Sequence, residues 1–239
     1  MEQGDAVSAI TQAEPSRGLS FRGLVEIFYK PAEFFAALKD NPKVLVPYIA
    51  YAILLIIFFV AAVNVIVEMQ LSSPQFQERM QGQTVTPQIK QWMTYQTMIG
   101  GPLVMLLMPL IAAAFALFWG NVVFSGNARF KQLLSVMLYG ELIYGLGMLV
   151  LLPIILVKKS LLVGFNLGVL AAGQGPDSVL YLALSKIDLF VIWEIIVIGI
   201  GLSILYNFTR NKGYLLSVLS MGMLSILHVV FTAIAKLIF

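Results

Sequence analysis

Five long apolar stretches constrain this chain more than any other feature of its sequence. Each approaches or exceeds the roughly 20 mostly apolar residues that a helix needs to cross the ~30 Å hydrocarbon core of a bilayer. An isolated strand cannot satisfy its backbone hydrogen bonds in lipid, so each stretch is predicted to be a helix. The predicted spans are residues 44–67, 99–124, 133–157, 189–206 and 214–239.

The charge content agrees with a membrane protein and excludes several other classes. Only 11% of the 239 residues are charged, whereas soluble domains carry about 25%. This composition excludes an ordinary soluble enzyme and a disordered protein, and the absence of cysteine excludes a disulfide scaffold. A single histidine and no cysteine leave no multi-His or thiolate metal site. The net charge of +3, without a dense basic cluster, predicts no nucleic-acid partner. We expect no metal and no cofactor.

The distribution of lysine and arginine predicts the orientation. With the N-terminus inside, the inner segments hold nine basic residues and the outer segments six. The two short inner loops, residues 125–132 and 207–213, each carry two basic residues and no acidic one. Short loops weigh most in this rule. We therefore predict a multi-pass protein of the cell inner membrane, with its N-terminus in the cytoplasm and its C-terminus outside.

The segment before the first span divides into two parts. Residues 1–19 are predicted to be disordered, and residues 20–43 form an amphipathic cytoplasmic segment ahead of the transmembrane domain, residues 44–239. Pro31 would interrupt a helix, so two short helices are expected. Their aromatic and basic side chains suit the headgroup layer of the inner leaflet, or else pack against the cytoplasmic loops. The candidate interfacial contacts are Phe21, Arg22, Phe28, Lys30, Phe34 and Phe35.

Two further segments lie between the spans. In the long, glutamine-rich outer loop, residues 68–98, Pro74 and Pro87 stand where helices could begin. Residues 161–173 are apolar but only 13 residues long, and three glycines interrupt them. That length favours an interfacial or re-entrant piece over a sixth span.

Two ionisable side chains of the last two spans are predicted to lie at similar depth. Glu194 stands 16 residues before Arg210, at the turn between these spans, and His228 stands 18 residues after it. A charge at the middle of a membrane helix costs about 2.5–3.5 kcal/mol, which makes such a residue a candidate for function. The pair predicts either a proton-linked or ion-linked site or a polar contact that holds the two helices together, and we favour the contact.

Glu141 is the third candidate, near the middle of the third span, with Tyr139 and Tyr144 close by in the sequence. No cationic residue of the spans lies at its depth. Glu141 is therefore expected either to be protonated and to donate to a carbonyl, or to face a polar cavity. Glu141, Glu194, His228, Tyr139 and Tyr144 together make up the candidate intramembrane polar site.

Three stretches of the sequence form a recognisable set: the lead-in LVEIFYKPAEFF at residues 24–35, GNARFKQLLS at residues 126–135, and IDLFVIW at residues 187–193. With these stretches the chain resembles the Yip1 domain family, in its bacterial branch. The resemblance implies a five-span membrane protein with an organising or accessory role. The Asp-Leu-Tyr-Gly-Pro stretch of eukaryotic members is absent, so their binding of prenylated small GTPases is not carried over.

No catalytic motif appears, neither a GxSxG elbow, a Walker A loop nor an HExxH pair. We therefore expect no enzyme and no catalytic residue. The leading expectation is a non-enzymatic, membrane-organising or protein-interaction component. Its partners would be the lipid bilayer and an unidentified membrane protein or a second copy of the chain. The alternative is a small transporter, channel or transporter subunit that uses Glu141, Glu194 and His228.

Overall fold

The computed structural model describes the backbone of residues 21–174 and 178–238. The side chains of Phe21, Arg22, Ala172 and most residues after Met223 lie outside the described part. Within it the chain is all-helical and contains no strand, as predicted. The elements are α1 (Phe21–Tyr29), α2 (Pro31–Leu38), α3 (Leu45–Leu71), α4 (Pro74–Met80), α5 (Pro87–Leu117), the π-helix η2 (Phe118–Val123), α6 (Phe130–Lys158), the 3-10 helix η3 (Leu167–Gln174), α7 (Val179–Ser185), α8 (Leu189–Tyr206) and α9 (Arg210–Ile238).

Four helices in the described residues are long and apolar enough to cross a membrane. They are α3, α5 continued through η2, α6 and α8, and they contain the first four predicted spans except for one residue at the start of the first span and one at the end of the second. Residues 214–238 of the fifth predicted span lie within α9, which has 29 residues, and residue 239 is outside the described part. Helix α9 is not among the four, and most side chains of its second half lie outside the described part. A fifth span therefore stays a prediction.

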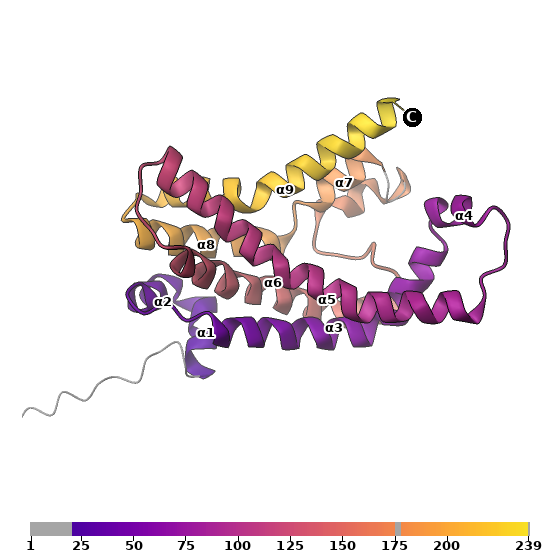
Figure 1. The fold of residues 1–239 in the computed structure, drawn as a ribbon, viewed down its shortest axis with the longest axis horizontal. Helices are drawn as coiled ribbons and strands as arrows, with labels where there is room; N and C mark the ends of the chain where they lie inside the picture. The colour runs from indigo at the N-terminus through magenta and orange to yellow at the C-terminus, as the bar shows by residue number, and fades with distance from the viewer. Residues whose placement is uncertain (1–20, 175–177, 239) are drawn as a thin grey trace, which may run out of the picture.

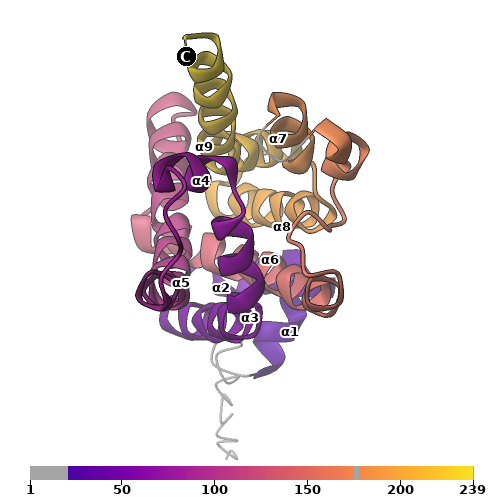
Figure 2. The same cartoon turned by 90° about the vertical axis from the view of Figure 1, so that its right-hand side faces the viewer.

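Helix α6 occupies the centre of the bundle, between α3 and α8 (Figures 1 and 2). Helix α5 packs on α3 and α6, and α9 packs on α8. Two glycines allow the close approach of α6 to α8. A Cβ added at Gly140 would collide with the Ile198 side chain, and one added at Gly147 would collide with the Phe190 ring. Small residues at a membrane helix interface permit this close packing.

The two N-terminal helices are separated at Lys30, and Pro31 occupies the first turn of α2, where its missing N–H is tolerated. The predicted division into two short helices is therefore confirmed. Helix α2 packs on α8, and Phe34 and Phe35 on α2 are both buried. The ring of Phe34 meets Tyr139 edge-on, with the ring centroids 4.6 Å apart. The segment ahead of the first span is thus built into the bundle.

Residues 39–44, 124–129 and 207–209 lie together at one end of the bundle, called here the N-terminal end. Polar contacts join these segments. The Gln132 amide donates to the Lys39 carbonyl oxygen at 3.0 Å. The Ser135 hydroxyl donates to the Lys43 carbonyl oxygen at 2.7 Å. The Lys39 ammonium group donates to Asn207 Oδ1 at 2.8 Å. These bonds connect the α2–α3 link to the start of α6 and to the end of α8.

The opposite end carries α4, α7 and η3 (Figure 1). As predicted, α4 begins at Pro74 and α5 at Pro87. The apolar residues 161–173 lead into η3 and form no long helix. Two backbone hydrogen bonds, from Leu167 N–H to Ile187 O at 3.0 Å and from Leu189 N–H to Phe165 O at 3.1 Å, hold this segment beside the start of α8. Its place as an interfacial or re-entrant piece stays a prediction.

Candidate intramembrane polar site

Two of the predicted residues, Glu141 and Glu194, come together at the interface of α6 and α8. Their exposed fractions are only 7% and 2%. Glu194 lies beside Gly140, since its Cγ is 3.6 Å from where a Cβ at Gly140 would stand, which is ordinary van der Waals contact. The two carboxyl groups are close enough to interact electrostatically. The sequence predicted the depth of each glutamate, and the structure adds that they are neighbours.

Two tyrosines complete this group, called here the carboxyl cluster: Tyr51, Glu141, Tyr144 and Glu194. Tyr51 reaches it from α3 and is fully buried. Its hydroxyl lies beside the Glu141 carboxyl, close enough to interact but outside the geometry of a full hydrogen bond. Tyr144, on α6 and half-buried, interacts with both carboxyl groups. Three spanning helices therefore contribute polar groups to one buried place.

The carboxyl cluster is not internally satisfied. Glu194 Oε1 and the Tyr51 hydroxyl have no hydrogen-bond partner among the residues that the structure describes. A buried polar group without a partner costs about 1–3 kcal/mol, and two buried carboxyl groups side by side need a shared proton or a cation. No group of three or more His, Cys, Asp or Glu suited to a metal ion occurs in the same part of the chain. The chemistry available is proton exchange or contact with a small cation.

The two other residues of the predicted polar site are Tyr139 and His228. Tyr139 is buried on another face of α6, against Phe34 of α2. The side chain of His228 lies outside the described residues, so its pairing with Glu194 stays a prediction.

The predicted interfacial residues occupy different environments. Phe34 and Phe35 face the inside of the bundle. Phe28 is half-buried, and its ring meets Trp193 of α8 edge-on at 5.8 Å between centroids. Lys30 is exposed and lies 3.5 Å from Glu33. The side chains of Phe21 and Arg22 lie outside the described part of the structure. Of the described four, only Phe28 and Lys30 remain available to a membrane surface.

The sequence did not single out Tyr51, because one tyrosine in a long apolar span has no distinguishing pattern. The sequence also did not predict a group of hydrogen-bonded polar residues at the N-terminal end. There the Tyr206 hydroxyl donates to Asn121 Oδ1 at 2.8 Å, and Asn121 exchanges two hydrogen bonds with the backbone of Ala128. Asn121 lies in the π-helix η2, and such π-turns often mark functional sites. Hydropathy does not reveal a π-turn.

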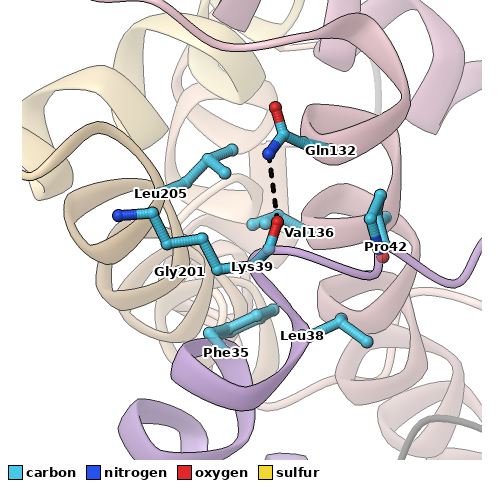
Figure 3. A pocket seen from close by; sticks show the side chains of 9 residues that line it. Phe35, Leu38, Lys39, Pro42, Gln132, Val136, Gly201 and Leu205 are labelled. Atoms are coloured by element: carbon cyan, nitrogen blue, oxygen red, sulfur yellow. Dashed lines mark hydrogen bonds between the residues drawn. The ribbon is translucent and has the colours of Figure 1, made fainter. Parts of the chain in front are cut away.

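A small cavity also lies at the N-terminal end, where the Gln132 amide points to the Lys39 carbonyl (Figure 3). Phe35, Gly201 and Leu205 contribute to its wall. Its volume is about 10 Å³, close to the least space that a single water occupies. It is therefore too small for a ligand.

The comparisons with known proteins agree with this architecture. The model of the Yip1 domain family matches residues 25–233. No curated protein and no solved structure matches the chain. The family match begins in the lead-in helix α1 and runs through the four candidate spans into α9. The chain therefore belongs to the Yip1 domain family, whose members are generally non-catalytic membrane proteins, and it is a multi-pass integral membrane protein.

Proposed function

We propose that this protein acts without catalysis, as a membrane-organising or protein-interaction component of the bacterial inner membrane. The observation that carries the proposal is the construction of the N-terminal end. The α2–α3 link and the loops after η2 and α8 are bonded to one another and to the spans. They therefore form one fixed face outside the bilayer, which a partner can recognise without first ordering separate loops.

The side chains of this face support a cytoplasmic position. The basic residues at or beside the N-terminal end are Lys39, Lys43, Arg129, Lys131, Arg210 and Lys212. Asp40 is the acidic residue in the same link. An excess of lysine and arginine marks cytoplasmic loops. The proposed orientation therefore has the N-terminus inside and, with α9 as a fifth span, the C-terminus outside.

Site-directed crosslinking in cells tests the interaction role. A photoreactive amino acid is placed at Asn127, which is exposed at the N-terminal end, and at Gln83, which is exposed at the opposite end, as the matched control. We expect discrete adducts from position 127 and none from position 83. Two differently tagged copies of the chain identify a self-adduct by its mass. Equal adduct yields at the two positions, or no adduct at either, would contradict the proposal.

A second candidate function, a small transporter or channel or a subunit of one, is favoured by one observation. The carboxyl cluster places two acidic groups and a phenol between three spans, and Glu194 Oε1 has no hydrogen-bond partner among the described residues. Proton and cation flux into proteoliposomes is measured for the wild type, Glu141→Gln and Glu194→Gln. Flux that both substitutions abolish would establish transport and exclude a purely organising role. Absence of flux from the folded wild type would exclude this second function.

A further inference from the structure

A groove at the N-terminal end combines basic and apolar walls. Its volume is about 570 Å³. The ten lining residues are Asn41, Pro42, Lys43, Val44, Leu45, Val46, Tyr48, Leu110, Lys131 and Leu134. Two of the ten are lysines, and none is acidic. The groove therefore offers positive charge and apolar surface together.

Neither lysine of the groove is neutralised within the described residues. Lys43 is half-buried and Lys131 is exposed, and neither ammonium group takes part in an ion pair of the described chain. Lys43 is held in place through its backbone, because its carbonyl oxygen accepts the Ser135 hydroxyl. Leu45 and Val46 also line the groove. They lie in the first turn of α3, which is closed by the hydrogen bond from Tyr48 N–H to Val44 O.

The two lysines lie at the depth of lipid headgroups. Lys43 stands two residues before α3, and Lys131 is the second residue of α6. Helix α3 has 27 residues, so at about 1.5 Å per residue it is about 40 Å long, more than the ~30 Å hydrocarbon core. The start of α3 therefore reaches the headgroup layer, while Leu110 and Leu134 continue the wall of the groove along the spans.

We propose that this groove binds one anionic phospholipid of the adjacent leaflet. Its phosphate is held by Lys43 and Lys131, and an acyl chain lies against Tyr48, Leu110 and Leu134. The charge of the groove selects an anionic headgroup over a zwitterionic one. The apolar wall distinguishes a lipid from a free phosphate ion, because only the lipid has a chain to bury there. The site is separate from the carboxyl cluster and does not depend on the proposed partner protein.

Lipid retention tests the proposal. The purified full-length protein is equilibrated in detergent with phosphatidylglycerol or phosphatidylcholine, and bound lipid is measured by native mass spectrometry. The test variant is the double substitution Lys43→Gln/Lys131→Gln. The matched control, Lys158→Gln/Lys159→Gln, removes the same charge at the other end of α6. Each lysine near an anionic lipid surface contributes roughly a factor of five in affinity. We therefore expect about a 30-fold loss of phosphatidylglycerol affinity in the test variant.

Three further arms make the result decisive. The conservative variant Lys43→Arg/Lys131→Arg should retain phosphatidylglycerol, and the helix content of every variant is checked by circular dichroism. The control variant should bind as the wild type does. Soluble glycerol phosphate in excess should not displace the lipid. Equal binding of the two lipids by the wild type, an equal loss in the control variant, or displacement by glycerol phosphate would each overturn the proposal.

Discussion

The contact of Tyr206 with Gly120 predicts a strongly non-additive pair of substitutions. The side chain of Tyr206 packs against η2 so closely that the three atoms nearest to a Cβ added at Gly120 all belong to it, with Cε2 at 2.8 Å. Gly120→Ala in the wild type must therefore displace the Tyr206 ring and its hydrogen bond to Asn121. Overpacking of this kind costs about 1–3 kcal/mol.

The partner substitution Tyr206→Leu removes all three colliding atoms. It also removes the hydroxyl bond and the stacking of Tyr206 on Phe208, whose rings are 4.9 Å apart and nearly parallel. These two losses cost together about 2 kcal/mol. In this background Gly120→Ala meets no tyrosine, so the double variant should be more stable than the sum of the single effects by about 1–3 kcal/mol.

The assay is the free energy of unfolding of the purified protein, from titration of detergent micelles with a denaturing detergent and helix content as the signal. Gly100→Ala is the matched control, since its added Cβ would meet only Gln96 Cγ, at 3.9 Å. The control should be neutral or stabilising by up to about 1 kcal/mol. Additive effects of the two substitutions, within about 0.5 kcal/mol, would refute the packing argument.

Three more outcomes are expected. Phe34→Ala should lower the free energy of unfolding by about 3–5 kcal/mol. The control Tyr29→Ala, at a side chain that is 58% exposed, should change it by less than about 0.5 kcal/mol. Similar losses in the two variants would contradict the burial of α2. Lys212→Met should lower the free energy of unfolding by about 1–2 kcal/mol. The reason is that the ammonium group lies 3.8 Å from the centroid of the Phe208 ring and donates to a backbone carbonyl. An unchanged free energy in the same assay would contradict a stabilising role for these two contacts. Because the chain has no native cysteine, single cysteines at Asn127 and Gln83 should be labelled by an impermeant maleimide from opposite sides of the membrane, and labelling from one side would refute the proposed topology.

The spans were predictable because hydropathy alone decides which segments enter a bilayer. The span at residues 189–206 agrees with α8 at both ends, where Asp188 caps the helix and Asn207 ends it in the left-handed conformation. The second span was predicted from Ile99, but α5 begins at Pro87. Its first three turns are polar, so they carry helix signals and no membrane signal. Boundaries outside the hydrocarbon region were therefore the weakest part of the prediction.

The composition of the carboxyl cluster was less accessible. The depth of Glu141 and Glu194 follows from counting residues along a helix, but their contact depends on how α6 and α8 are rotated about their axes. At Gly140 this arrangement leaves no room for a Cβ, because the Ile198 side chain occupies the space. One glycine among the 19 of the chain has no pattern that would indicate this role. Tyr51 was missed for a related reason, since its helix is apolar on every side.

The docking of α2 on α8 has a consequence for the order in which the protein is made. Lys39 and Asn207, which the docked arrangement joins by a hydrogen bond, are 168 residues apart in the chain. At a synthesis rate of about 5–20 residues per second, α2 leaves the ribosome roughly 10–30 s before the end of α8 exists. During that interval Phe34 and Phe35 have no α8 to bury them. Closure of the bundle over the aromatic lead-in therefore waits for the fourth span, whereas the contact of Phe34 with Tyr139 of α6 is available earlier.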